Sequence, residues 1–188
     1  MPKARDIASE LSPSRPPPQP HNPAEWLALG RALDREMRQR WGIDAHANTI
    51  AIGWTSVPGL RAHRFLGASQ TVRVRAAVPS PTPHVVAPRS NAQFVDHAEQ
   101  DVVNAFIDAM SGLPRPDRDL SGEFLRIYIS HARGPCGACR QGLKSRQTFP
   151  GVIADLSRRY PGLSITLAWE NRDLALEFMQ VQDGERIG

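Results

Sequence analysis

The chain has 188 residues, the size of one domain, and 40% of them are hydrophobic, which is enough for a packed core. The sequence predicts no membrane-spanning segment, and the first ten residues lack the apolar stretch of a secretory signal peptide. The net charge is +4, and 21 of the 23 basic residues are arginine. Arginine suits phosphate and base recognition, but a GC-rich genome produces the same bias, so composition leaves both explanations open.

Residues 1–21 are polar and rich in proline, which predicts a linker or disordered tail ahead of a domain over residues 22–188. The first helix of that domain has clear boundary signals. Asn22 is placed to cap it, Pro23 suits its first position, and Gly42 is placed to end it. One apolar stripe at helical spacing is expected to pack against the core and consists of Trp26, Leu29, Leu33, Met37 and Trp41.

Three strands are predicted next, over residues 49–54, somewhere in 62–66, and over 71–78. Four prolines in residues 79–89 predict a loop there. His84 in this loop is a candidate base or phosphate contact, although a solvent-facing histidine is the alternative. Together these segments predict a hairpin or meander ahead of the next helix.

A helix is predicted just after His97, because apolar residues recur at helical spacing at Val102, Val103, Phe106, Ile107 and Met110. The apolar run over residues 124–129 predicts a strand. Pro135 suits the first turn of a further helix running to about residue 147, with Cys136 and Cys139 on one side of it. The order helix, strand, helix would therefore carry ligands at the start of both helices.

The side chains of His97, Cys136 and Cys139 supply one imidazole nitrogen and two sulfurs, which is a three-ligand set for Zn²⁺. Three protein ligands leave the fourth tetrahedral position for water, and Glu99 is placed to move protons on that water. Residues two apart do not share a helix face, so His97 and Glu99 converge only if the helix points its N-terminus at the metal. A thioredoxin-like redox pair, or a closed zinc site with His131 as the fourth ligand, is the alternative.

The C-terminal part of the chain predicts a helix over residues 152–160, a strand over 163–169 and a last strand over 174–181. Only four residues separate the two strand segments. A crossover helix does not fit into so short a connection, so these strands are expected to pair antiparallel.

The pattern H-x-E…P-C-x-x-C at residues 97–99 and 135–139 resembles the zinc-dependent cytidine-deaminase-like superfamily. Within it, the segment SHARGPCGAC at residues 130–139 is similar to deaminase domains of bacterial polymorphic toxins. The resemblance implies a three-layer α/β fold with a mixed sheet of about five strands and helices on both faces. It also implies zinc bound by His97, Cys136 and Cys139, with Glu99 as the catalytic acid and base.

The implied activity is hydrolytic conversion of cytosine to uracil in nucleic acid, with DNA favoured over RNA as the substrate. The implied setting is a secreted interbacterial toxin that acts in the cytoplasm of a target cell and is blocked by a cognate immunity protein. Deamination of free nucleosides, nucleotides or RNA, or a non-enzymatic zinc-stabilised binding module, is the alternative. The candidate substrate contacts border the expected pocket and are Asn48, Ser130, His131, Arg133 and Pro135. Three aromatic residues, each also a candidate for the core, could stack on the base: Trp54, Tyr128 and Trp169.

Overall fold

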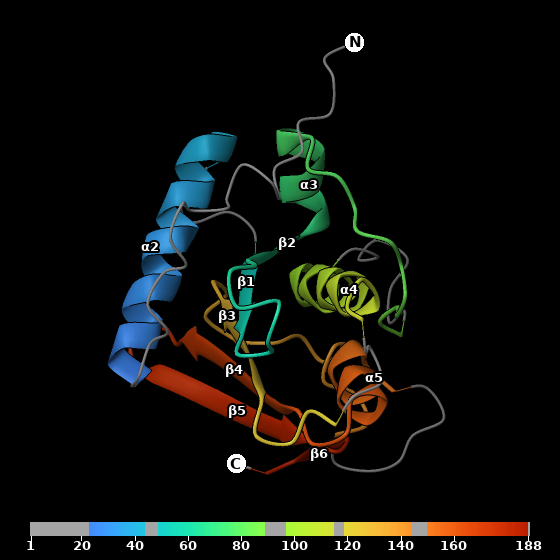
Figure 1. The fold of residues 1–188 in the computed structure, drawn as a ribbon. Helices are drawn as coiled ribbons and strands as arrows, with labels where there is room; N and C mark the ends of the chain where they lie inside the picture. The colour runs from blue at the N-terminus through green and yellow to red at the C-terminus, as the bar shows by residue number, and fades with distance from the viewer. Residues whose placement is uncertain (1–22, 44–48, 89–96, 115–118, 144–149, 188) are drawn as a thin grey trace.

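A mixed sheet runs through the computed structural model in the strand order β2-β1-β3-β4-β5-β6 (Figure 1). The structure describes residues 23–43, 49–88, 97–114, 119–143 and 150–187. The strands are β1 (Ile50–Thr55), β2 (Phe65–Ala68), β3 (Phe124–Ile129), β4 (Ser164–Glu170), β5 (Leu176–Gln182) and β6 (Glu185–Arg186). Strands β3 and β4 pair parallel and the other neighbours pair antiparallel. The α/β class and the mixed sheet are confirmed, and β6 is a strand that the sequence did not predict.

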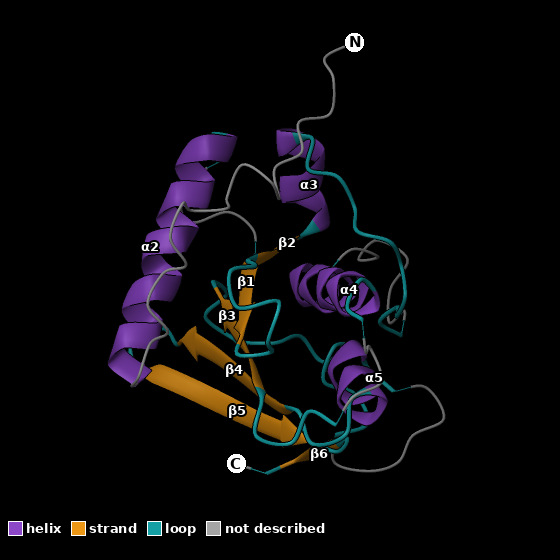
Figure 2. Cartoon of the chain, in the orientation of Figure 1, coloured by secondary structure: helices purple, strands orange, loops and turns teal. Residues whose placement is uncertain are grey.

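Helices cover both faces of the sheet, as Figure 2 shows. Helix α2 (Pro23–Trp41) lies on one face, and helices α4 (Ala98–Ser111) and α5 (Val152–Arg159) lie on the other. The alternation of side chains along β1 divides the core accordingly. Ile50 and Ile52 join the apolar cluster under α2, whereas Ala51 joins the cluster under α4 and α5. The predicted three-layer arrangement is therefore confirmed.

The strand predicted over residues 71–78 is wrong, because this segment forms helix α3 (Gln70–Ala76). Its valines alternate with polar residues, which imitates a strand, but only Val72 is buried, whereas Val74 is 75% exposed. Arg73 between them is also buried, because it pairs with Asp101 of α4. This tertiary ion pair overrides the local β preference. The strand expected in 62–66 begins at Phe65 and runs on to Ala68.

The helix predicted to begin at Pro135 is also wrong, since the chain makes a series of turns from Gly137 to Gly142. We call residues 136–142 the cysteine turn. Gly142 adopts a left-handed φ of 80°, which a continuing helix does not allow. The predicted extension of this helix to about residue 147 lies outside the described residues from 144 onward.

The other predicted elements lie close to their expected places. Helix α2 ends at Trp41 and is followed by Gly42 with a φ of 62°, while the proposed cap Asn22 lies outside the described residues. Strands β4 and β5 pair antiparallel, which confirms the inference from the short connection between them. Among the described residues, no helix is both long and apolar enough to cross a membrane.

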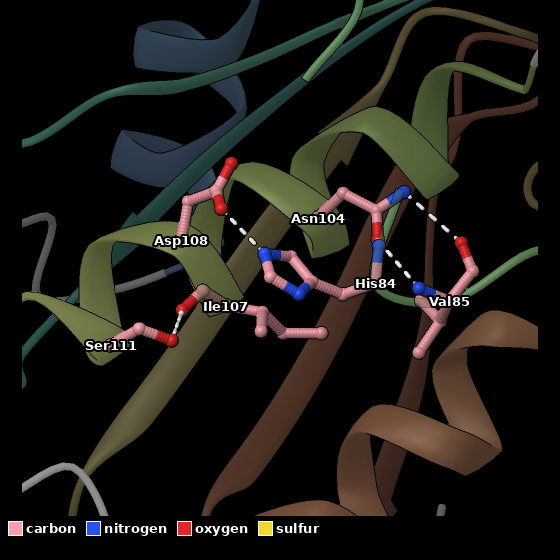
Figure 3. A network of polar contacts seen from close by, with 6 residues as sticks. All are labelled: His84, Val85, Asn104, Ile107, Asp108 and Ser111. Carbon is pink, nitrogen blue, oxygen red and sulfur yellow. Dashed lines mark hydrogen bonds and ion pairs between the residues drawn. The ribbon is translucent and has the colours of Figure 1, made fainter. Parts of the chain in front are cut away.

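A short segment without regular secondary structure, residues 84–87, runs along α4 and is called the strap here (Figure 3). Three α4 side chains one turn apart hold it. Gln100 accepts a hydrogen bond from the Ala87 N–H, and Asn104 accepts from the N–H groups of His84 and Val85. The Asn104 amide also donates to the Val85 carbonyl, and Asp108 lies 2.5 Å from the His84 ring. The part of the predicted loop over residues 84–87 is thus bound to α4.

Replacing Asn104 by alanine is expected to destabilise the protein by about 2–4 kcal/mol, because three backbone groups of the strap, in two buried hydrogen bonds and one part-buried one, lose their partner. Urea denaturation of the variant measures this loss. The matched control is Ser111→Ala on the same helix, whose hydroxyl only donates to the Ile107 carbonyl and is partly exposed. A loss no larger for Asn104→Ala than for Ser111→Ala would contradict the role given to the strap.

Candidate metal centre

The side chains of His97, Cys136 and Cys139 converge although they come from distant parts of the chain. Their ligand atoms all lie within 4.8 Å of one another, and the Cys136 sulfur lies 3.2 Å from His97 Nδ1. Donors bound to one zinc ion lie about 3.5 Å apart, given the usual zinc–sulfur and zinc–nitrogen bond lengths. This group could hold a metal ion, and within the described part of the chain it is the one cluster of three or more such donors found.

His97 reaches the cysteines because it stands at the N-cap of α4 with an extended backbone (φ −109°, ψ 135°). Its carbonyl accepts the first helical hydrogen bond, from the Asp101 N–H at 3.2 Å. Strand β2 holds this end of the helix closely, since a Cβ on Gly67 would overlap the Ala98 carbonyl oxygen. The expectation that the helix N-terminus faces the site is therefore confirmed.

The cysteine turn is positioned by β3 on one side and by the start of α5 on the other. The Cys139 N–H points at the Cys136 sulfur at 3.3 Å, which fixes the position of that sulfur within the turn. The Ile153 N–H in the first turn of α5 donates to the Cys139 carbonyl at 3.2 Å. The second helix N-terminus near the site is thus that of α5, and not of a helix beginning at Pro135 as predicted.

Glu99 lies beside the three donors and is itself 3% exposed. Its Oε1 accepts a hydrogen bond from the Cys136 N–H at 3.0 Å, so the carboxylate is fixed against the cysteine turn. Burial is the main cause that raises the pKa of Glu99, and the negative charge of Cys136 adds to it. A buried carboxyl with a raised pKa is suited to accept and donate protons near neutral pH.

The two cysteines differ in their affinity for a proton. The Cys139 thiol donates to the Cys136 sulfur, and this hydrogen bond is the main cause that lowers the pKa of Cys136. The same interaction, together with burial, raises the pKa of Cys139. Without a metal the pair therefore shares one proton at neutral pH, and a metal ion that binds both sulfurs must displace it.

The predicted substrate contacts are distributed around this centre. Pro135 is buried next to Cys136, whereas His131 and Arg133 are exposed in the loop before it, where the Arg133 N–H donates to the His131 ring. The Ser130 hydroxyl accepts hydrogen bonds from Arg38 of α2 and from the Ile50 N–H, so this side chain faces the α2 layer. Asn48 lies outside the described residues.

Of the three aromatic candidates for base stacking, two belong to the core. Trp54 is 1% exposed and Tyr128 is 5% exposed, both in the cluster under α2. Trp169 is partly exposed, and its ring lies against Gly134, where a Cβ would overlap it. Trp169 is therefore the aromatic side chain that borders the loop leading to the cysteine turn.

Two groups of residues near the centre were not predicted from the sequence. One is the buried pair Arg73–Asp101, and the other is the set of strap contacts from Gln100 and Asn104. The position of Asp101, four residues after His97, is a signal that the sequence did contain. Its partner, Arg73, is 28 residues away in a segment predicted as a strand, so the pairing could not be predicted from the sequence.

Comparison with known proteins adds no family assignment. No family model matches the chain, and neither the curated proteins nor the solved structures give a significant match.

Metal affinity is expected to rise about tenfold per pH unit between pH 6 and 8, because binding displaces the one proton shared by the cysteines. The sign follows from the raised pKa of Cys139, since protons compete with the metal more strongly at lower pH. Competition titrations with a chelator at three pH values measure the slope. An affinity independent of pH over this range would contradict the shared proton.

Proposed function

We propose that the protein is a zinc-dependent hydrolytic deaminase that converts cytosine to uracil in nucleic acid, with DNA favoured over RNA as the substrate. The observation that carries the proposal is the position of Glu99. A buried carboxylate outside the three-donor group is hydrogen-bonded to the backbone of one donor, Cys136. A carboxylate beside a group of three donors supports a catalytic rather than a structural zinc.

The geometry favours this proposal over the two alternatives. A redox pair needs only the two cysteines, yet His97 Nδ1 lies 3.2 Å from the Cys136 sulfur. A closed structural zinc needs a fourth donor, and the donor cluster found among the described residues has three members. His131, the fourth ligand considered from the sequence, is exposed, and its ring accepts from the Arg133 N–H.

The donor set fits zinc, because one imidazole and two thiols, one of them with a lowered pKa, are the ligands this ion prefers. When bound, zinc lowers the pKa of a coordinated water towards neutrality. Glu99 then accepts a proton from the attacking water and delivers protons to the ring nitrogen and to the departing amine. One water is consumed, the C4–N bond breaks, and ammonia leaves.

The base must leave the stack to reach a buried carboxylate, so the proposed substrate is a single strand or a flipped nucleotide. Exposed arginines on both sides of the cysteines, Arg133 and Arg140, support a polymeric substrate with phosphates. Trp169 is the candidate stacking partner. The role as a secreted toxin with an immunity protein stays a prediction from the resemblance.

The variant Glu99→Gln is expected to lose about 10²–10⁴-fold in deamination rate, because the amide cannot exchange protons in the reaction. It should still bind one zinc, since Glu99 is not among the three donors. Purified protein is incubated with single-stranded DNA, duplex DNA and RNA, and sequencing counts the C-to-U changes.

The control for this experiment is Glu185→Gln, which makes the same chemical change on an exposed residue of β6 and should retain full activity. Deamination by Glu99→Gln at the parent rate would refute the assignment. A parent protein that binds zinc but deaminates none of the three substrates would refute the proposed function.

A further inference from the structure

The two sulfurs of the metal centre lie close together within a single tight turn. Their distance is covered by the 4.8 Å within which all three donor atoms fall. The Arg140 N–H donates to the Cys136 carbonyl at 3.2 Å and closes one turn of chain around both cysteines. A turn closed in this way places Cα atoms three residues apart at about 5 Å from each other. A disulfide needs Cα atoms roughly 4.4–6.8 Å apart, so the backbone of the cysteine turn suits this bond.

Hydrogen bonds to other parts of the protein hold the cysteine turn in this shape. The Cys139 N–H points at the Cys136 sulfur at 3.3 Å, and the Cys139 carbonyl accepts from the Ile153 N–H of α5. The Cys136 N–H donates to Glu99 at 3.0 Å. All of these bonds join protein atoms, so the nearness of the two cysteines does not depend on a bound ion.

The two cysteines differ in their access to solvent. Cys139 is completely buried in the core under α4 and α5, whereas Cys136 is partly exposed. A small oxidant in solution therefore reaches the Cys136 sulfur first. Cys139 is the other of the two cysteines in the chain and lies directly behind it. This is the arrangement of an accessible thiol with a resolving thiol beside it.

We propose that Cys136 and Cys139 are an oxidation site, in which a peroxide attacks at Cys136 and Cys139 closes an internal disulfide when no metal holds the sulfurs. In the first step the Cys136 sulfur takes one oxygen of hydrogen peroxide, the O–O bond breaks, and a sulfenic acid and one water form. In the second step the Cys139 sulfur attacks the Cys136 sulfur, the S–O bond breaks, and a second water leaves. Two electrons pass from the two thiols to the peroxide.

The disulfide and the metal compete for the same two sulfurs. Zinc binds cysteine as the thiolate, and a sulfur in a disulfide is no longer such a ligand. Oxidation should therefore empty the centre and prevent it from being loaded. The inference goes beyond the proposed deamination, because it requires the geometry of the cysteine turn and no reaction on a nucleobase.

The first experiment treats the full chain, freed of zinc with a chelator, with hydrogen peroxide. Mass spectrometry should show a loss of about 2 Da, the two thiol hydrogens, in the monomer. The oxidised protein should bind no zinc, and dithiothreitol should restore binding. Protein loaded with zinc beforehand should form the disulfide more slowly. Disulfide-linked dimers, or a sulfinic acid at Cys136 with no internal disulfide, would overturn the inference.

The order of attack is tested with two variants and with dimedone, which labels sulfenic acids. Under peroxide, Cys139→Ser should carry the label on Cys136, whereas Cys136→Ser should be labelled at least about tenfold more slowly. Labelling at equal rates would contradict the order.

A measurement on the parent protein keeps the test independent of how the variants fold. Iodoacetamide should alkylate Cys136 in the native, zinc-free chain at least about tenfold faster than Cys139, and at similar rates in guanidinium, which is the control. Equal native rates would overturn the assignment of Cys136 as the first site of attack.

The two proposals fail separately. Deamination by a protein that forms no internal disulfide would overturn this inference alone, whereas the disulfide without deamination would overturn the proposed function alone.

Discussion

The structure depends on the contact between the first turn of α4 and the cysteine turn. The hydrogen bond from the Cys136 N–H to Glu99 and the approach of His97 to the Cys136 sulfur are both made there. These residues come from two elements joined to different strands of the sheet, so the order of the strands brings them together. Edge strand β2 contacts the start of α4 at Gly67, and β3, which precedes the cysteine turn in the chain, lies on the other side of β1.

The centre is built in a layer where charge is costly, and each charge in it has a partner. Burial raises the pKa of Glu99, and a shared proton reduces the charge of the two cysteines. Asp101 is balanced by Arg73. A metal ion bound by the two cysteines would bring positive charge next to the acidic groups of Glu99, Cys136 and Cys139. The acidic groups that lie close together in the metal-free site therefore favour a bound cation.

Much of the fold was predictable because its signals are local. The caps and apolar stripe of α2, the helical spacing in α4 and the short connection between β4 and β5 each determine one element without help from the rest. Helix α3 was mistaken for a strand because its valines alternate with polar residues, and the contact of Arg73 with α4 is tertiary, so no local pattern records it. The cysteine turn was mistaken for a helix because Pro135 is a good first residue, whereas the bond from the Ile153 N–H of α5 to the Cys139 carbonyl is a tertiary contact that the local pattern does not record.

The candidate site divides in the same way. The three donors and Glu99 follow from the spacing of residue types whose chemistry is specific, and the structure brings all four together. The groups that hold them, Asp101 with Arg73 and the strap with Gln100 and Asn104, are ordinary polar residues, and only their contacts give them a role. Sequence reasoning therefore identified the residues that converge, and not the residues that hold them in place.

In the proposed centre, one metal ion binds one imidazole and two sulfurs, and its fourth coordination position stays open. X-ray absorption at the zinc edge of the zinc-loaded protein tests it directly. We expect two sulfurs at about 2.3 Å and two lighter atoms at about 2.0 Å, one of them not from the protein. A shell of four sulfurs, which this chain with its two cysteines can supply only by sharing the ion with a second copy, would contradict it.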